Sequence, residues 1–487
     1  MKEFFNGFFG RQSPIGQKFL DNFKFGHGKI LTVPMNISLN VPEQVSEILN
    51  KFEKAGHEIY IVGGLVRDVL LKKDLYDWDF STNAVPDEIL KLFGDEAFYD
   101  NKYGTVGVKN PDGRSYEITT FRTEHGYSDS RHPDKVTWGK TLEEDLKRRD
   151  FTVNSLALKR LGDQSFEVID LHGGLEDLKN KLIRAVGNPE ERFEEDALRM
   201  MRAVRLAAQL QFSIEETTLK AIKAKASQIQ HIAWERIRDE LLKIMASDYP
   251  ADGYLVLRNC GLGAVILPEV EQAFGVEQKS PGRHHTYDVG THSVESLRNC
   301  QSPNPITRLA TLIHDAGKVR TQKIFPDGRI TFYNHEMESA KIARTIADRL
   351  RFSNEQKDLL VRLVRWHQFT VNEFQTDAAV RRFIVNVGKD NIDEMLALRT
   401  ADRLGSGAKM TSWRTEEFKK RITLVQQQPF SIPDLKIDGH DVIRVKKVSP
   451  GPVVGKCLQM VFEEVVEKKL INEREVLLAR LEEIDGD

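Results

Sequence analysis

Cysteine is scarce in this sequence of 487 residues, and Cys260, Cys300 and Cys457 form no CxxC pair. Scattered thiols of this kind exclude a disulfide scaffold and a cysteine-based structural zinc site, and they fit a reducing compartment. No apolar run reaches the length of a membrane span, and the N-terminus lacks the apolar core of a secretory signal. The sequence therefore predicts a soluble cytoplasmic protein.

An excess of positive charge is also missing. The 71 Lys and Arg residues face 73 Asp and Glu residues, which gives a formal net charge of -2. Any site for a polyanion must then be a local patch rather than a property of the whole chain. The chain is too long for a single core, so several domains, roughly two to four, are expected.

The stretch GGLVRDVLLKKDLYDWDFST, residues 63–82, places two glycines close to two aspartates. The preceding EIYIV alternates as a strand does, residues 65–71 have helical spacing, and DWDF has the character of a second strand. Residues two apart on a strand point to the same side, so Asp77 and Asp79 are expected to project together. Paired carboxylates beside a glycine turn favour a site for divalent metal and phosphate.

Such a pair supports two-metal phosphoryl transfer, in which carboxylates bridge two cations. Glu117, in YEITTF, is a candidate third carboxylate if its strand lies alongside. Gly63 and Gly64 would let the backbone approach phosphates closely, and Arg67 would neutralise them. Alone, DxD is a weak signal because ordinary turns also produce it. The combination is much more specific.

Three blocks in this order resemble the tRNA nucleotidyltransferase and bacterial poly(A) polymerase family. They are GGLVRD with DWDFST, then KRRDFTVNSLAL (147–158), then FEEDALRMMRAVRLAAQLQF (193–212). The resemblance covers roughly residues 58–245, through ERIRDELLKIM, and departs from the family at Lys72, where glycine is usual. It implies an enzyme that adds nucleotides to RNA without a template.

The resemblance also implies roles for individual residues. Magnesium would be held by the two aspartates of DWD. Nucleotide contacts would come from Gly64, Arg67, Arg149, Asp150 and Asn154, of which the last two would organise the ribose side.

The segment EDALR can be interpreted from base chemistry. Cytosine and adenine both present an exocyclic amine beside an unprotonated ring nitrogen, whereas uracil and guanine present a carbonyl beside an N–H. One Asp that accepts and one Arg that donates would select C and A. Asp196 and Arg199 are three apart and are expected on one helix face. In the family the corresponding pair reads the incoming base; the alternative is a simple intrahelical salt bridge.

Arg202 and Arg205 continue the same three-residue spacing, which drifts around a helix by about 60° per step. They cannot all face one base. The resemblance implies that both contact the nucleotide, either at its phosphates or because the helix is shifted relative to the base. For Arg205, a structural or tRNA-facing role is the alternative.

The product of such an enzyme is the CCA end of tRNA, part of that end, or a poly(A) tail. The loop TEHGYSDSRHPDKV, residues 123–136, resembles the flexible loop that CCA-adding members use when they switch from C to A. The chain ends in the acidic LLARLEEIDGD, whereas a poly(A) polymerase of this family would carry a basic extension for single-stranded RNA. The sequence favours CCA addition over poly(A) synthesis.

Residues 284–402 carry a second set of histidines and aspartates, whose order resembles the HD phosphohydrolase superfamily. Imidazoles and carboxylates on helices can form a mixed N/O site for a divalent metal. The resemblance makes His292, His314, Asp315 and Asp402 the metal ligands, with His335 and His367 as second-tier ligands or phosphate contacts. The alternative is an HD scaffold that has been retained for its shape.

The expected fold class is α+β: a nucleotidyltransferase head with a mixed β-sheet, followed by an all-helical neck, an HD-containing body and a tail. The expected bounds are a Phe-rich extension at 1–33, the head at 34–170, the neck at 171–250, the body at 251–428 and the tail at 429–487. In the tail, LKIDGHDVI and VSPGPVVGKCLQ resemble the same nucleotidyltransferases, and GPVVG is expected to start a helix that meets tRNA phosphate.

The expected partners are tRNA, CTP and ATP, and the expected cofactors are Mg²⁺ at the head and a divalent metal of unknown identity at the HD site. Three alternatives remain open. They are a poly(A) polymerase, a metal-dependent phosphohydrolase whose head only binds nucleotide, and an RNA-binding protein without activity. Intact Asp77 and Asp79 argue against the last.

Overall fold

The computed structural model describes most of the chain between residues 35 and 484. The residues that it leaves undescribed in this range are 76, 102–103, 110–114, 126–134, 140, 279–286, 370–375, 427–431 and 468. The predicted N-terminal extension therefore lies outside the described residues, as does most of the predicted flexible loop. The chain divides into two compact units, Met1–Tyr249 with Val256–Ile266, and Pro250–Leu255 with Leu267–Asp487.

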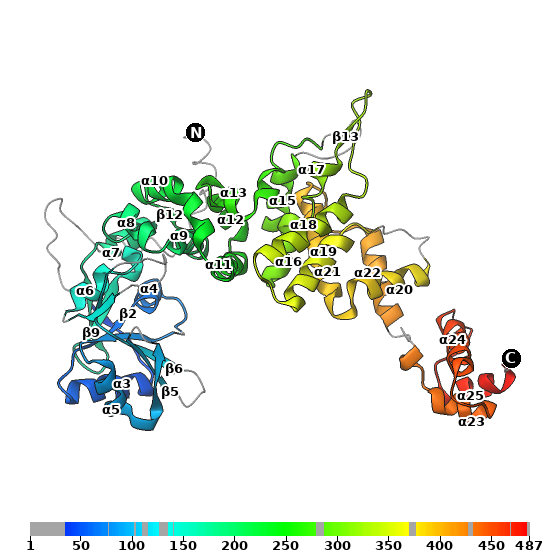
Figure 1. The fold of residues 1–487 in the computed structure, drawn as a ribbon, viewed down its shortest axis with the longest axis horizontal. Coiled ribbons are helices and arrows are strands. Elements are labelled where there is room, and N and C mark those ends of the chain that lie inside the picture. Colours follow the sequence, from blue (N-terminus) through cyan, green and yellow to red (C-terminus); the bar gives the residue numbers. More distant parts are fainter. Residues whose placement is uncertain are drawn as a thin grey trace. The chain divides into compact units, whose positions relative to one another are not determined.

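The first unit is built on an eight-stranded sheet, coloured blue to cyan in Figure 1, with the strand order β1-β10-β9-β2-β3-β6-β5-β4. The strands are β1 (Met35–Ser38), β2 (Ile59–Val62), β3 (Asp79–Thr82), β4 (Ala97–Asn101), β5 (Thr105–Lys109), β6 (Ser115–Thr120), β9 (Leu156–Arg160) and β10 (Ser165–Asp170). Only the β3–β6 pairing in this sheet is parallel. The mixed sheet that the sequence predicted is confirmed.

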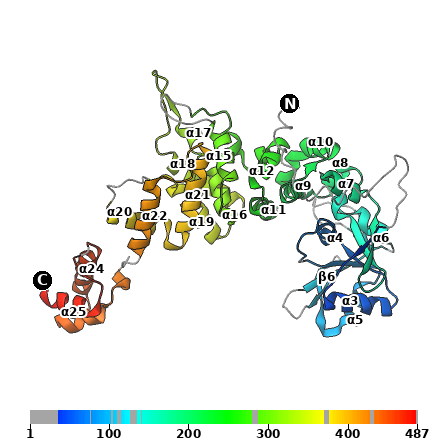
Figure 2. The ribbon, with the colours of Figure 1, turned by 180° about the vertical axis from the view of Figure 1, so that it is seen from behind.

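Helices α3 (Glu43–Lys54) and α5 (Pro86–Phe93) lie together on one side of this sheet (Figures 1 and 2). The stripe Val45, Ile48, Leu49 and Phe52 is buried, as its helical spacing requires. Phe52 packs against Phe93 of α5, with ring centroids 5.9 Å apart. The strand β2 follows α3 and ends at Val62, and the glycine turn begins at the next residue.

After the sheet the first unit becomes helical. The helices that follow the sheet are α7 (Gly174–Asn180), α8 (Pro189–Glu195), α9 (Leu198–Leu210), α10 (Glu216–Lys225), α11 (Trp234–Ala246) and α13 (Leu262–Ile266), whereas α4 (Gly64–Leu70) and α6 (Leu142–Lys147) lie between its strands in the sequence. A short strand pair, β11 (Leu182–Ile183) with β12 (Ser213–Ile214), lies among them. Residues 122–125 and 135–138 form β7 (Arg122–His125) and β8 (Lys135–Trp138), an antiparallel ribbon at the two ends of the predicted loop.

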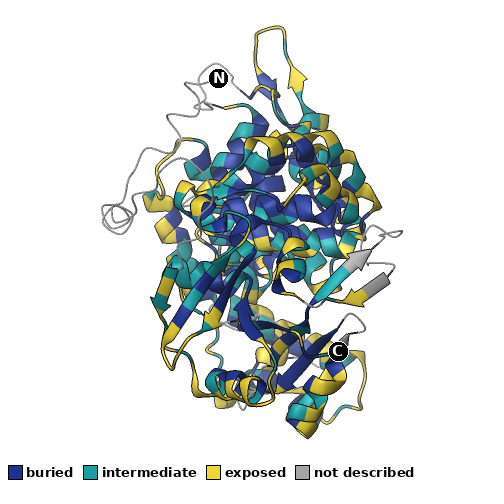
Figure 3. Ribbon diagram, turned by 90° about the vertical axis from the view of Figure 1, so that its left-hand side faces the viewer, coloured by how far each residue is buried: buried dark blue, intermediate teal, exposed yellow. Residues whose placement is uncertain are grey.

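Where the structure describes it, the second unit is helical, apart from the short hairpin β13 (Lys323–Ile324) and β14 (Ile330–Thr331). Its main helices are α15 (Val289–Arg298), α16 (Pro305–Ile313), α17 (Lys318–Thr321), α18 (His335–Arg349), α19 (Asn354–Trp366), α20 (Asp377–Val387), α21 (Ile392–Gly405) and α22 (Trp413–Gln426). Helix α15 packs against α16 and α21, and α18 packs against α19. Buried residues gather on the strands and on the inner faces of the helices (Figure 3).

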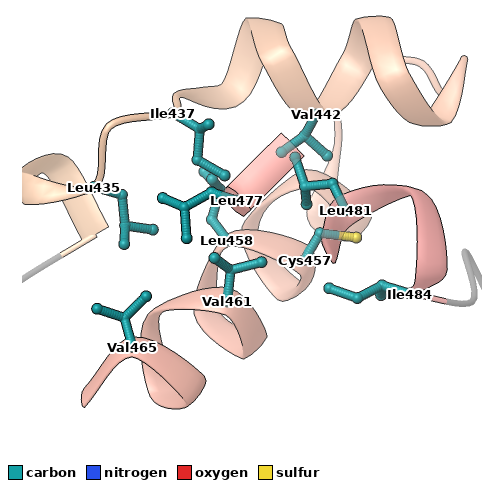
Figure 4. Packing of buried hydrophobic residues seen from close by; sticks show 10 residues of the cluster. All are labelled: Leu435, Ile437, Val442, Cys457, Leu458, Val461, Val465, Leu477, Leu481 and Ile484. Carbon is teal, nitrogen blue, oxygen red and sulfur yellow. The ribbon is translucent and has the colours of Figure 1, made fainter. Parts of the chain in front are cut away.

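The last helices, α23 (Gly439–Lys446), α24 (Pro452–Val466) and α25 (Arg474–Glu483), surround a small apolar core of their own. Figure 4 shows Val442, Leu458, Val461 and Leu477 converging in it. The prediction that GPVVG starts a helix is confirmed, since α24 begins at Pro452. In the described part of the chain, no helix combines the length and the apolar character that crossing a bilayer requires.

Candidate functional site

The glycine turn lies directly between β2 and α4. Gly63 has φ 81°, a conformation that favours glycine. A Cβ atom at this residue would lie 3.1 Å from Nη1 of Arg149 and 3.6 Å from Oδ2 of Asp79. At Gly64, a Cβ atom would lie 3.4 Å from Nη2 of Arg67. The turn therefore has little room for a side chain at Gly63, where the backbone lies close to Arg149 and Asp79.

Asp79 is the first residue of β3, and its neighbour in the parallel pairing with β6 is Glu117. Glu117 was predicted as a third carboxylate only if its strand lies beside that of Asp79, and the pairing of β6 with β3 meets this condition. Asp77 lies just before the strand, so the prediction that DWDF is wholly strand is wrong for its first two residues. The side chain of Asp77 is exposed and that of Asp79 is partly buried.

The electrostatics around Asp79 fit a divalent cation. Burial, and then the negative charge of Glu117, raise the pKa of Asp79 to about 6, although Arg149 opposes the shift; Asp77 adds to it. Carboxylates that repel one another in this way lower their energy when they share a cation. Carboxylate oxygens are also the ligands that Mg²⁺ prefers.

Arg67 does not stand free in the turn. Its Nη1 donates to Oδ1 of Asn154 over 2.7 Å, and its Nη2 lies 2.8 Å from Oδ2 of Asp68. Asn154 ends a single 3₁₀ turn, Thr152–Asn154. The contact brings two of the predicted nucleotide-binding residues together, from motifs that are 87 positions apart.

Asp145 is a residue that the sequence analysis missed. It is fully buried on α6, and its carboxylate accepts from Arg148 (2.6 Å), from Arg149 (3.2 Å) and from Ser81 Oγ (3.0 Å). Burial by itself would raise the pKa of Asp145, but the two guanidinium groups lower it. Since Ser81 lies on β3 two residues after Asp79, Asp145 ties Arg149 to the strand of Asp79. Its i,i+3 and i,i+4 spacing to two arginines was the signal that could have found it.

Asp150 pairs with Arg202 of α9, with 2.8 Å between Oδ2 and Nη2. Burial would raise the pKa of Asp150, but Arg202 and then Arg199 hold it below its usual value. The ion pair thus joins the KRRDFTVNSLAL block to α9, the helix that carries Arg199.

The prediction that Asp196 and Arg199 share one helix face is wrong. Helix α8 ends at Glu195, Asp196 is extended with φ -146°, and α9 begins at Leu198. The two side chains have different partners. Asp196 accepts from the Leu198 amide (2.9 Å) and from Arg236 Nη2 (2.9 Å).

Arg199 donates through Nη1 to Glu195 Oε2 (2.5 Å) and to the Arg192 carbonyl (3.1 Å). The alternative interpretation, a salt bridge between Asp196 and Arg199, is therefore wrong as well. Asp196 pairs with Arg236, and Arg199 pairs with Glu195. Sequence reasoning missed the helix break because no glycine or proline marks it, and it gave Arg236 no role.

Arg205 contacts other residues than those of the candidate nucleotide site. Its Nε lies 2.7 Å from Oε2 of the buried Glu240, and its Nη1 donates to Gln209 over 3.0 Å. Glu240 belongs to α11, so Arg205 holds α9 against α11. This contact favours the structural alternative for Arg205.

All six residues of the predicted HD set come together in the second unit. His292 lies on α15, His314 and Asp315 follow α16, His335 begins α18, His367 follows α19, and Asp402 lies on α21. The shortest links from imidazole Nε2 to carboxylate are 3.2 Å, for His292 with Asp402, His314 with Asp315 and His335 with Asp315.

The histidines are oriented by the backbone. Nδ1 of His314, His335 and His367 lies 2.7, 2.9 and 2.7 Å from the carbonyl of the residue three positions earlier. A proton on each Nδ1 leaves the Nε2 lone pair directed at the centre, as in metal-binding histidines. Burial would lower the pKa of His314, but Asp315 and Asp402 raise it to about 10, so without a cation Nε2 carries a proton at neutral pH, which a metal ion would displace.

A cavity of about 570 Å³ opens onto this cluster. Its lining includes Asp315, His335, His367 and Asp402, together with the cationic side chains Lys318, Arg399 and Arg403. The size is that of a small-molecule site.

Comparison with known proteins defines the class of the chain. Residues 59–184 match the family described as "Poly A polymerase head domain", and residues 330–481 match a tRNA nucleotidyltransferase domain 2. A further match to an RNA-binding region of polymerase A covers residues 211–274. The matches thus identify the chain as a nucleotidyltransferase.

The curated relatives are more specific. A CCA-adding enzyme of Limosilactobacillus reuteri is 36% identical over 442 residues, which are 91% of this chain and 96% of that protein. One from Enterococcus faecalis is 33% identical over 93% of this chain and 97% of its own length. The chain belongs to the family of CCA-adding enzymes.

Solved structures agree with this assignment. The CCA-adding enzyme of Bacillus stearothermophilus in complex with CTP has a TM-score of 0.63 and 26% identity, and the match covers 91% of this chain and 96% of that one. The Thermotoga maritima enzyme complexed with tRNA shares the fold, with a TM-score of 0.58 and 20% identity over 92% of this chain and 98% of that one.

Proposed function

We propose that this protein adds the 3′-terminal CCA sequence to tRNA, using CTP and ATP and releasing pyrophosphate. The observation that carries the proposal is full-length similarity to enzymes with this name, combined with Asp79 and Glu117 side by side at the glycine turn. The reaction is attack of a tRNA 3′-hydroxyl on the α-phosphate of the nucleotide. A poly(A) polymerase is the alternative product class, and the curated relatives named above argue against it.

The family depends on divalent metal, and we assign Mg²⁺ to Asp77, Asp79 and Glu117. When bound, the metal would lower the pKa of the attacking hydroxyl and hold the triphosphate. Arg149, kept in place by Asp145, faces the same space as Asp79 across Gly63 and is assigned to phosphate.

The remaining predicted residues are assigned to the rest of the nucleotide. Arg67 is assigned to phosphate, and Asn154, which accepts a hydrogen bond from it, is assigned with Asp150 to the ribose. Arg202, which pairs with Asp150, is assigned to nucleotide contacts as well. Asp196 and Arg199 read the base edge. The N-terminus of α24 at Gly451 and Pro452 is assigned to tRNA phosphate in the tail.

The experiment that tests this function uses tRNA that lacks its last three nucleotides. With CTP alone the product should end in CC, with both nucleotides in CCA, and with ATP alone it should stay unextended. Sequencing of the product ends distinguishes these outcomes. A tail of many adenosines from ATP alone would show a poly(A) polymerase instead.

A second activity is favoured by the His/Asp cluster and its cavity. We propose that this cluster hydrolyses a phosphomonoester or a 2′,3′-cyclic phosphate at an RNA end, which would expose the hydroxyl that the head needs. Its metal ligands would be His292, His314, Asp315 and Asp402, all at least partly buried.

The double variant His314→Ala with Asp315→Ala should lose phosphate release from 2′,3′-cyclic nucleotide but keep addition to a tRNA with a free 3′-hydroxyl. The reason is that the two centres use different ligands from different units of the chain. Loss of both activities in a folded variant would mean that these helices serve the polymerase. If the wild-type protein hydrolyses nothing with any of several divalent metals, the His/Asp cluster is a scaffold that has been retained for its shape.

A further inference from the structure

The carboxylate of Asp145, on α6, uses its two oxygens for two different arginines. Oδ2 accepts from Nη2 of Arg149 over 3.2 Å and from Oγ of Ser81 over 3.0 Å. Oδ1 accepts from Nε and Nη2 of Arg148, over 2.9 and 2.6 Å. Asp145 and Ser81 are both fully buried, so neither can touch a nucleotide itself. Any effect of Asp145 on the reaction must therefore pass through the groups that it holds.

The Oδ2 side of this carboxylate leads to the candidate metal site. Ser81 lies two residues after Asp79 on β3, so the two side chains point to the same face of the strand. Nη2 of Arg149 donates both to Asp145 and to Ser81 Oγ, the latter over 3.4 Å. Nη1 lies at the glycine turn, where a Cβ atom on Gly63 would be 3.1 Å from it. Asp145 and Ser81 therefore set where the guanidinium of Arg149 meets a phosphate.

The Oδ1 side leads to the candidate base-reading arginine. Helix α6 ends at Lys147, and Arg148 is its C-cap residue. A carbonyl at this end of a helix has no partner inside the helix and can accept from elsewhere. The carbonyl of Arg148 accepts from Nη2 of Arg199 over 3.4 Å. Because Asp145 holds the Arg148 side chain through two nitrogens, it also restrains the position of this carbonyl.

Arg199 is buried and is held on its other side by α8. Its Nη1 donates to Glu195 over 2.5 Å and to the Arg192 carbonyl over 3.1 Å. The contact of Nη2 with the Arg148 carbonyl is longer than both, so it is the weakest of the three and the easiest to exchange for the ring nitrogen of a base. When Nη2 turns to a base, the last turn of α6 is released from α9. The base and the phosphates of one nucleotide are thus connected through this turn.

We propose that Asp145 is a positioning residue that couples recognition of the base to placement of the phosphates. Through Oδ2 it aligns Arg149 with the metal carboxylates, and through the Arg148 carbonyl it sets Arg199 for the base. A base that does not engage Arg199 leaves the contact with Arg148 in place and gains nothing from this coupling. Discrimination against U and G then arises in the rate of transfer as well as in binding. The inference rests on the proposed CCA addition and deepens it.

The test is single-turnover addition of CMP and of UMP to a trimmed tRNA. Enzyme is in excess and the nucleotide is saturating, so the rate constant does not depend on the folded fraction. Asp145→Asn should lower the rate with CTP by about 50-fold but with UTP by only about fivefold, because both nucleotides use Arg149 and only C uses Arg199. Glu143→Gln, which neutralises an exposed carboxylate of the same helix, should keep both rates. An equal drop with CTP and UTP would overturn the coupling.

Two further variants separate the two sides of the carboxylate. Ser81→Ala weakens only the Oδ2 side, so it should lower the rates with CTP and UTP equally, by about threefold. Unchanged rates in this variant would overturn the assignment of Asp145 to Arg149.

In an Arg199→Ala background, Asp145→Asn should lower the rates with CTP and UTP alike, because its effect on base choice passes through Arg199. Further narrowing of the base preference in that background would overturn the connection through the Arg148 carbonyl. Failure of the proposed function is distinct from both results, since it would appear in the wild-type protein as a trimmed tRNA that gains no CCA.

Discussion

Replacing Asp79 with alanine should reduce nucleotide addition by about 10³-fold or more, because the carboxylate that faces both Glu117 and the glycine turn would be gone. Asp77→Ala should have a similar effect. Affinity for tRNA should remain nearly unchanged in both variants, because contacts to phosphate elsewhere dominate it. The measurements are single-turnover addition of CMP to a trimmed tRNA and filter binding of the same tRNA.

The matched control is Asp74→Ala, which removes an exposed carboxylate from the same connection between α4 and β3. It should leave addition within about twofold. Asp79→Ala retaining a tenth of wild-type activity would contradict the two-metal assignment.

Misfolding is separated from lost chemistry by thermal unfolding. The folded-state pKa of Asp79 is raised to about 6, so its ionised form opposes folding progressively as the pH rises from about 4 to 6, and fully above that. Without divalent metal at pH 7, Asp79→Ala should therefore melt no lower than the wild type. A clear drop in melting temperature would mean that the lost activity has a structural cause.

The strand, turn and helix around Gly63 could be predicted because each has a local signal. β-Branched alternation marks β2, a glycine pair marks the turn, and apolar spacing marks α4. The position of Glu117 could only be stated as a condition, since the pairing of β6 with β3 joins residues 38 positions apart in sequence. Strand order is a property of packing, and no local pattern encodes it.

The helix break at Asp196 illustrates a different limit. Local helical propensity is good through EEDALRMM, so periodicity alone continues one helix across it. The structure instead ends α8 and lets Asp196 accept from the Leu198 amide, as an N-cap does. Arg236, far along the chain, stabilises this break by pairing with the same carboxylate. Local propensity does not include such a tertiary ion pair, so periodicity could not predict the break.

The His/Asp cluster shows that the members of a site can be predicted from sequence while their arrangement in space cannot. The six positions follow from their order in the sequence, whereas their approach to one another depends on where three helices, α16, α18 and α19, end or begin. His314 and His367 both cap the C-terminal ends of their helices, and His335 begins one. Such ends are the least predictable part of a helix.

Base selection should fail when Asp196 or Arg199 is replaced. In the protein without nucleotide, Asp196 accepts from Arg236 and from the Leu198 amide, and a carboxylate has lone pairs beyond these two. Arg199 donates to Glu195 and to the carbonyls of Arg192 and Arg148, so it would exchange one of these contacts for the ring nitrogen of C or A. Each partner is held by its own neighbour, so the two are fixed before the nucleotide arrives.

Asp196→Ala and Arg199→Ala should therefore each lower kcat/KM for CTP and ATP together, by about 10²-fold, and should narrow the preference over UTP and GTP. The drop should be similar for both correct nucleotides because cytosine and adenine offer the same two groups. Glu194→Ala, which removes an exposed carboxylate two residues away, is the control and should keep the wild-type preference. The measurement is single-turnover addition with each of the four nucleotides in turn. If Asp196→Ala and Arg199→Ala retain full discrimination against UTP, the bases are selected by other groups, and the pairs with Arg236 and Glu195 serve only to hold the break between α8 and α9.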